Sequence, residues 1–235
     1  MNFSKSFEQV KNSVLHILVG GDENQIVSSC SGMLVLDGSV AITCAHCIIP
    51  SMKIFIRSPE KDEMIEGELY KINSDKDIVL IKFPESIGIG VKLRNSNTAK
   101  IGQECFVVGF PLNIKSITAL SAHIAGFEHY RDFDLVRIDA SINHGLSGGP
   151  LFNTNGELIG IVNAKHGSLS DFLSWVESAR PGAMVSIGGI DPVKAIQQLI
   201  REMKINLNLN LGMDYAIPIN VVGNIDNEVR GAIVP

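Results

Sequence analysis

The sequence predicts an all-β protein made of two β-barrels that lie side by side, with a helical insertion in the second barrel. Short runs of β-branched residues alternate with Gly, Asn, Asp and Pro, which is the pattern of strands joined by turns. Helical periodicity is scarce before residue 190. The strand-like runs form two sets of about six, divided near residue 95, and such sets indicate two barrels.

The first barrel is expected in residues 1–95. Its candidate strands are short β-branched runs, and they comprise Val14–Val19, Ile26–Val35, Val40–Thr43, Lys53–Arg57, Ile65–Ile72 and Ile78–Phe83. A polar stretch, Leu93–Lys100, comes after them and is typical of a linker. The chain contains no internal repeat of fixed period.

The second barrel is expected in residues 96–235. Its candidate strands are Glu104–Phe110, Ser116–Phe127, Leu135–Asp139, Pro150–Phe152, Leu158–Ala164 and Met213–Ile219. Residues 167–211 interrupt this set as an insertion with two expected helices, Ser170–Ala179 and Asp191–Lys204. The second helix has Asp191 as a suitable N-cap and Pro192 at its first position. The insertion either packs its apolar face on the second barrel or serves as a docking element or gate.

Composition excludes several classes of function. The 235 residues are 45% hydrophobic and 19% charged, as in ordinary globular proteins. A net charge of −5 and the lack of any Lys/Arg run argue against a nucleic-acid partner. The longest apolar runs are strand-sized and too short to span a bilayer. Because residues 1–14 have no apolar leader pattern, a cytoplasmic location is the expectation.

Three local motifs carry the candidate chemistry. Thr43-Cys44-Ala45-His46-Cys47 comes directly after a candidate strand. Asp77 opens the apolar run 78–82, and Gly145-Leu146-Ser147-Gly148-Gly149-Pro150 lies in the second set of strands. Each motif alone is ambiguous, because a single His, Asp or Gly-flanked Ser usually belongs to a core, a surface or a tight turn. Their combination in the order His, Asp, Ser points to nucleophilic catalysis.

Acyl transfer by a serine needs these residue types. A hydroxyl becomes a good nucleophile when an imidazole within hydrogen-bond reach takes its proton, so Ser147 and His46 form the candidate pair. A buried carboxylate, Asp77, would fix the imidazole tautomer. The N–H groups of Gly145 and Ser147 are expected to form an oxyanion hole. Asp75 is a rival for the carboxylate, and Asp77 is preferred because it adjoins the apolar run.

At these residues the chain resembles the trypsin-like serine peptidases, and among them the bacterial HtrA-like protease domain. The resemblance covers roughly residues 14–220 apart from the insertion, and includes 137–150, 155–161 and 215–218 besides the motifs above. It implies a chymotrypsin-like double β-barrel and a serine endopeptidase that acts on protein or peptide substrates without a cofactor. No peptide-binding (PDZ) domain is expected after the last strand.

The resemblance also implies a pocket for the substrate residue before the scissile bond. Its floor would be Ser141 and Ile142, and its walls would include Asn163, Ala164, Lys165 and Asp214. Because the floor has no carboxylate, a strict preference for Lys or Arg is not expected, and Ile142 suggests small or medium apolar side chains. A carboxylate on the wall could still attract a basic residue, so this alternative stays open.

The chain departs from secreted trypsin-like zymogens at the residue before the candidate nucleophile. Their freed N-terminus pairs with an aspartate just before the serine, and this position is Leu146 here. Cleavage before Val19 is therefore not expected to activate the protein. Cys30 and Cys47 match the positions of a disulfide in trypsin-like enzymes, and a reducing compartment would keep them as thiols. Four cysteines without paired Cys-x-x-Cys spacing predict no zinc site.

Two other functions remain as hypotheses. The chain could be a catalytically silent binding module that keeps the fold, although all three triad residue types are present. It could also be a protease that a regulatory protein partner activates through residues 167–211.

Overall fold

The computed structural model describes residues 2–23, 25–57, 64–111, 114, 116–163, 194, 196–199 and 213–235. Its contacts divide the chain into two units, residues 1–164 with 212–235, and residues 165–211. Both expected barrels lie in the first unit, so the two barrels can be described together.

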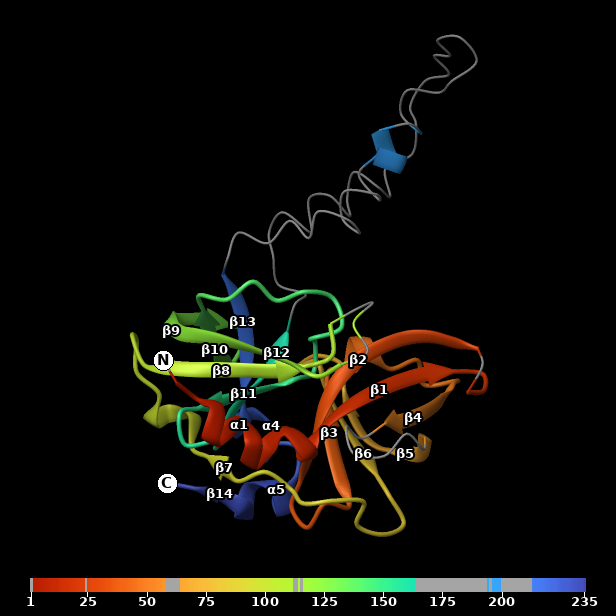
Figure 1. Ribbon diagram of the computed structural model, residues 1–235, viewed down its shortest axis with the longest axis horizontal. Helices are drawn as coiled ribbons and strands as arrows, with labels where there is room; N and C mark the ends of the chain where they lie inside the picture. The colour runs from red at the N-terminus through yellow and green to blue at the C-terminus, as the bar shows by residue number, and fades with distance from the viewer. Residues whose placement is uncertain are drawn as a thin grey trace. The chain divides into compact units, whose positions relative to one another are not determined.

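The first barrel is a closed ring of six antiparallel strands in the order β1-β2-β3-β6-β5-β4 (Figure 1). The strands are β1 (Val14–Gly20), β2 (Ile26–Val35), β3 (Val40–Thr43), β4 (Lys53–Arg57), β5 (Met64–Asn73) and β6 (Ile78–Lys82). Their burial explains the sequence pattern. All of β3 and most of β6 are buried, whereas β5 is exposed or half-buried except at Gly67, so much of this strand meets solvent.

The second barrel is closed in the same way. Its strands are β8 (Glu104–Gly109), β9 (Thr118–Tyr130), β10 (Phe133–Ile138), β11 (Pro150–Asn153), β12 (Leu158–Asn163) and β13 (Asp214–Pro218). Strand β11 pairs with both β8 and β12, which joins the two ends of the sheet. Two short strands, β7 (Leu93–Arg94) and β14 (Ile233–Val234), extend it beside β12. The predicted all-β double barrel is confirmed.

Some elements of the first unit differ from the expectation. The expected linker 93–100 contains β7 and a 3₁₀ turn, η3 (Ser96–Thr98). Three short helices were not predicted, namely α1 (Ser4–Val10), α4 (Ile219–Gly223) and α5 (Asn227–Ala232). Ahead of α1, the ring of Phe3 stacks on Phe106 of β8 with centroids 4.6 Å apart. The start of the chain therefore packs on the second barrel, and a domain boundary at residue 95 stays a prediction.

A smaller apolar cluster lies within the second barrel, and a larger one runs through both barrels. It extends from Ile17 and Ile42 in the first barrel to Phe106 and Phe152 in the second, all of them fully buried. Burying each such side chain stabilises the fold by about 1.5–3 kcal/mol before entropy is counted. The shared core holds the two barrels in a fixed relation, so residues from both can meet with defined geometry.

Most of the predicted insertion lies outside the described residues, including all of the expected helix 170–179. Of the expected helix 191–204, the described residues 194 and 196–199 are helical. Among the residues that the structure describes, no helix is long and apolar enough to cross a membrane.

Candidate active site

Strand pairing brings His46 and Asp77 together. β3 pairs with β6 so that Thr43 lies opposite Val79. The chain leaves β3 through a 3₁₀ turn, η2 (Ala45–Cys47), while Asp77 stands just before β6. The N–H of Ala45 donates to the backbone oxygen of Asp77 at 3.1 Å, which ties the turn to that strand end. The sequence separation of 31 residues thus becomes a direct contact.

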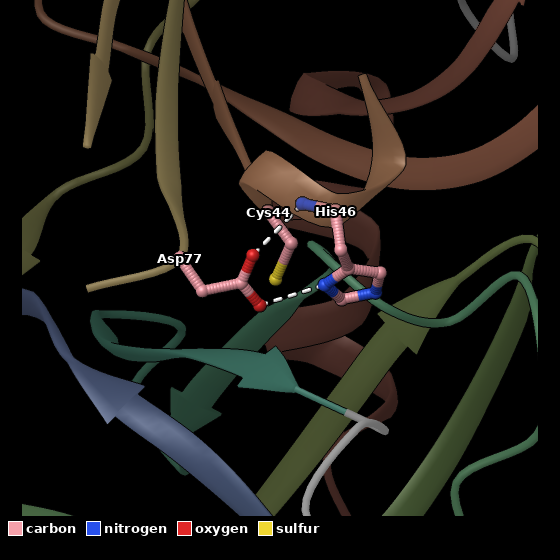
Figure 2. Close-up of side chains that lie close together, drawn as sticks. All are labelled: Cys44, His46 and Asp77. Carbon is pink, nitrogen blue, oxygen red and sulfur yellow. Dashed lines mark hydrogen bonds and ion pairs between the residues drawn. The ribbon is translucent and has the colours of Figure 1, made fainter. Parts of the chain in front are cut away.

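The Asp77 carboxylate holds His46 through both of its oxygens (Figure 2). The backbone N–H of His46 donates to Oδ1 at 2.8 Å, and ring Nδ1 lies 2.6 Å from Oδ2. A carboxylate next to Nδ1 favours the tautomer that carries its hydrogen there and leaves Nε2 as an acceptor. Asp77 has a φ of 54°, a left-handed conformation that Asp and Asn tolerate better than most residues.

A third donor reaches the same carboxylate from the second barrel. Asn163 ends β12, is fully buried, and donates from Nδ2 to Asp77 Oδ2 at 2.8 Å. From the sequence this residue was expected to be a pocket wall, and its contact with Asp77 was not foreseen. No local signal could have shown it, because the two residues are 86 positions apart.

The pKa of His46 reflects two opposing effects. Burial lowers it, whereas the hydrogen bond to Asp77 and the contact with Cys47 raise it, and the net result is a pKa of about 9. The carboxylate therefore stabilises the imidazolium form, as a general base requires after it has taken a proton.

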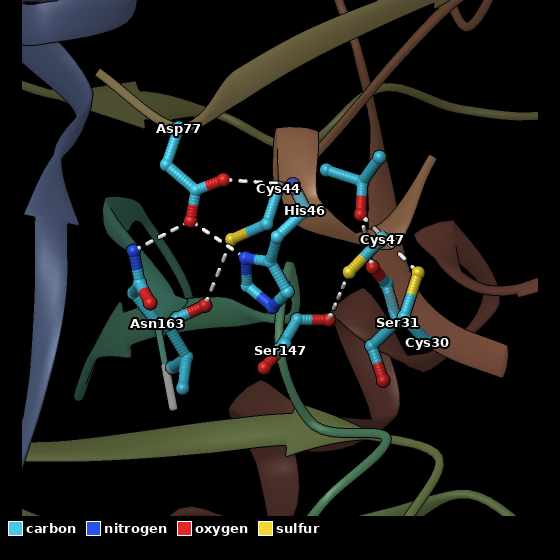
Figure 3. A network of polar contacts seen from close by, with 10 residues as sticks. Cys30, Ser31, Cys44, His46, Cys47, Asp77, Ser147 and Asn163 are labelled. Atoms are coloured by element: carbon cyan, nitrogen blue, oxygen red, sulfur yellow. Dashed lines mark hydrogen bonds and ion pairs between the residues drawn. The ribbon is translucent and has the colours of Figure 1, made fainter. Parts of the chain in front are cut away.

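Ser147 lies on the other side of the imidazole ring from Asp77 (Figure 3). It is 7% exposed and belongs to the turn that precedes β11. Its backbone oxygen accepts from the N–H of Ser31 in β2 at 3.0 Å. Among the described residues, no hydrogen bond joins Ser147 Oγ to His46, and such bonds are often long before substrate binds.

The turn around Ser147 leaves two N–H groups available. Leu146 N–H donates to Asn143 O at 3.1 Å, and Gly145 has a φ of 91°, which together define a type II turn. Within the described part of the chain, the N–H groups of Gly145 and Ser147 donate to no other group. Gly148 has a φ of 79°, and a Cβ there would lie 2.1 Å from Thr43 Oγ1. Glycine is therefore required where the turn meets β3.

The rival carboxylate faces elsewhere. The Asp75 side chain is 89% exposed and pairs with Arg131, with 3.0 Å between Oδ1 and the guanidinium. The Asp77 side chain is only 14% exposed. The geometry near His46 thus favours Asp77 over Asp75.

The expected pocket residues are placed as follows. Ser141 is exposed, and the Ile142 side chain is buried in the core of the second barrel. The buried Asp214 accepts the N–H of Ile142 through Oδ2 at 2.7 Å, so its carboxylate stabilises the chain at the expected floor. Ala164 and Lys165 lie outside the described residues. The pocket assignment itself stays a prediction.

Cys44, together with His46 and Asp77, forms a cluster of three possible metal ligands. Their candidate ligand atoms lie within 4.8 Å of one another. These residue types can bind zinc. However, the Cys44 thiol is fully buried, donates to Val162 O at 3.4 Å, and has a pKa raised far above its usual value, mainly by burial. His46 Nδ1 and Asp77 Oδ2 are at hydrogen-bond distance. The cluster therefore fits a proton between imidazole and carboxylate better than a metal ion.

All four cysteines are buried free thiols. Cys47 Sγ lies 3.8 Å from Ser147 O, and Cys30 Sγ lies 3.6 Å from Thr43 Oγ1, so both thiols line the back of the site (Figure 3).

Comparison with known proteins agrees with this geometry. The family model described as "Trypsin-like peptidase domain" matches residues 30–161, which is more than half of the chain. The chain belongs to this family. The matched segment contains all three candidate triad residues.

Curated relatives of this trypsin-like peptidase are serine proteases. The "Probable periplasmic serine endoprotease DegP-like" of Pseudomonas fulva is 30% identical over 145 residues. The aligned segment covers 60% of this chain and 30% of the relative. "Serine protease HTR4" of Bos taurus is 29% identical over 174 residues, and the aligned segment covers 67% of this chain and 36% of that relative. The chain thus spans about a third of the length of these relatives. The expectation of HtrA-like similarity is confirmed.

Solved structures show the same fold. "HtrA-type protease AlgW with tripeptide" matches with a TM-score of 0.69 at 16% identity, covering all of this chain and 65% of that one. A serine-to-alanine variant of the same protease matches with a TM-score of 0.68 at 17% identity, covering 96% of this chain and 62% of that one.

The expected cytoplasmic location is wrong. Several bacterial relatives of this trypsin-like peptidase are named periplasmic, which contradicts a cytoplasmic location. The lack of an apolar leader pattern was too weak a signal for that prediction.

Proposed function

We propose that this trypsin-like peptidase is a serine endopeptidase with His46, Asp77 and Ser147 as its triad. The observation that carries the proposal is the imidazole of His46, which is bonded to Asp77 through Nδ1 and has Ser147 on its other side. This is the order of groups that proton transfer from a serine requires.

The reaction follows from these positions. His46 Nε2 takes the proton of Ser147 while Oγ attacks the carbonyl carbon of the scissile peptide. The tetrahedral intermediate collapses, the C–N bond breaks, and the imidazolium returns the proton to the leaving amine. Water then attacks the acyl-enzyme in the same way and releases the acid. Asp77 keeps its charge throughout and stabilises the imidazolium.

The turn at Gly145 supports the proposed oxyanion hole. The N–H groups of Gly145 and Ser147 have no acceptor among the described residues, so both are available to a developing oxyanion. In another protease, the loss of one side-chain donor of this kind costs about 3–4 kcal/mol of transition-state stabilisation.

The position of Asp214 supports an apolar preference in the specificity pocket. Its carboxylate accepts the N–H of Ile142 and is buried, so its charge is directed at the protein backbone. We therefore expect small or medium apolar residues before the scissile bond. A peptide-library cleavage profile dominated by Arg or Lys would contradict this expectation.

A fluorophosphonate probe tests the function directly. We expect covalent labelling of the wild-type chain and none of Ser147→Ala, together with cleavage of a denatured protein mixture by the wild type only. A folded wild-type chain that is neither labelled nor active would indicate a silent binding module instead. Labelling that appears only with an added protein partner, and is lost on deletion of 167–211, would indicate partner control.

A further inference from the structure

The segment that carries the proposed nucleophile needs an anchor. In zymogen-type relatives an ion pair to the residue before the serine holds this segment, but Leu146 is apolar and fully buried here. We propose that Ser31 is a positioning residue that holds Gly145–Ser147 and thereby orients the Ser147 N–H and hydroxyl. This inference rests on the proposed peptidase function.

Ser31 binds both ends of the segment. Its hydroxyl donates to Gly145 O at 2.7 Å, and its backbone N–H donates to Ser147 O at 3.0 Å. The same hydroxyl accepts the N–H of Phe110, just after β8, at 2.8 Å. Ser31 is fully buried, so water does not compete for these bonds. A single residue thus connects β2, the end of β8 and the turn.

Two held carbonyls restrict the peptide between them. The Ser147 N–H belongs to the peptide that joins Leu146 to Ser147, and the peptides on either side are both bonded to Ser31. With its neighbours fixed, this peptide can rotate only by changing ψ of Leu146 and φ of Ser147 together, and a flip would bring φ of Ser147, which is not glycine, into an unfavourable region. The bonds to Ser31 therefore keep the Ser147 N–H directed to where an oxyanion would form.

The Ser31 side chain packs against two glycines. A Cβ on Gly109 would lie 2.4 Å from Ser31 Oγ, and one on Gly149 would lie 3.2 Å from Ser31 Cβ. Glycine at position 109 is therefore required for the Ser31 hydroxyl to lie where it does. Its removal would leave the buried Gly145 carbonyl without the bond that it now accepts, and the segment would move to find another donor.

The test compares Ser31→Ala with Ser29→Ala. Ser29 lies two residues earlier in β2, and its hydroxyl is bonded to His16 Nε2 at 2.8 Å, so the control loses one hydroxyl and one hydrogen bond of the same strand. We expect Ser31→Ala to lower kcat about 10- to 100-fold with KM nearly unchanged, and to weaken a peptide boronate inhibitor by a similar factor. The boronate mimics the tetrahedral intermediate, whereas KM with slow turnover reports ground-state binding.

Thermal melts of both variants accompany the kinetics. Ser31→Cys, which keeps a weak donor, should have a kcat between those of Ser31→Ala and wild type, and it carries the test if the alanine variant does not fold. A Ser31→Ala enzyme with the kcat and boronate affinity of Ser29→Ala would overturn the role of Ser31 alone. A wild-type chain without activity or probe labelling would overturn the proposed function, and this inference with it.

Discussion

Replacing Asp77 with Asn removes one charge from the site and changes almost nothing in shape. The carboxylate accepts hydrogen bonds at Oδ2 from His46 Nδ1 and Asn163 Nδ2, and at Oδ1 from the His46 N–H. An asparagine that keeps its oxygen toward the His46 N–H would place its NH₂ group against both of the other donors. The imidazole must then accept at Nδ1 and carry its hydrogen on Nε2.

That tautomer cannot take the proton of Ser147. The same change in a well-studied serine protease triad lowers kcat about 10⁴-fold. At 1.36 kcal/mol for each factor of ten, this corresponds to about 5 kcal/mol of lost transition-state stabilisation. Because the charge-assisted bond to Asp77 raises the pKa of His46, the variant should also have a lower His46 pKa than the wild type.

The assay is kcat/KM on a fluorogenic peptide with an apolar residue before the cleaved bond. Asp75→Asn is the matched control, because that side chain is exposed and pairs with Arg131. We expect near-normal activity and unchanged melting for the control, and a folded but less stable Asp77→Asn, because its NH₂ group would face the Asn163 donor. Near-normal turnover by a folded Asp77→Asn, with a large loss in Asp75→Asn, would refute the assignment.

Three other measurements test contacts of the site and its surroundings. Asn163→Ala should lower kcat about 10-fold, because Asp77 loses one charge-assisted donor; steady-state kinetics would show a smaller loss than in Asp77→Asn. Stability should peak near pH 6.5 in thermal melts, since the pKa of His46 is raised to about 9 and that of His16 is lowered to about 4, by burial and then Arg57. The contribution of His46 to the free energy of unfolding is present below pH 6.5 and is lost as the pH rises through 9. Below pH 6.5, protonation of His16 in the unfolded chain lowers the free energy of unfolding as the pH falls toward 4. If His16→Phe and wild type lost stability identically between pH 6.5 and 4, the proposed effect of His16 would be contradicted. Alkylation of the denatured chain without reductant should add four adducts by mass, as the four separate thiols of the structure imply, and two adducts would show the Cys30–Cys47 disulfide that an oxidising compartment allows.

The strands were predictable because their pattern is local. Three ranges, 26–35, 40–43 and 53–57, have the same bounds in sequence and structure, and the other predicted strands differ by one to three residues at their ends, whereas β7 and β14 were not predicted. The short helices were not foreseen, since α1 depends on a distant ring contact between Phe3 and Phe106. For α5 a signal existed: Asp226 caps the helix by accepting the N–H groups of Glu228 and Val229.

The site shows the same division between local and distant information. Residue types and order pointed to His46, Asp77 and Ser147, because each has a recognisable neighbourhood along the chain. The roles of Asn163 and Ser31 depend on partners 86 and 114 positions away. Such pairings arise from barrel closure and from the packing of one barrel on the other, and no pattern in a short window encodes them.

The left-handed backbone at Asp77 limits how this position could evolve. With a φ of 54°, the residue must tolerate an unusual main-chain shape and also deliver an oxygen to Nδ1 at 2.6 Å. Glycine would satisfy the first demand and glutamate would fail it, while its longer side chain would overshoot the ring. Asparagine fits the backbone but would turn its NH₂ group toward Nδ1, so aspartate alone would place a charged oxygen there. Sequences that keep the proposed triad should therefore keep aspartate at this position.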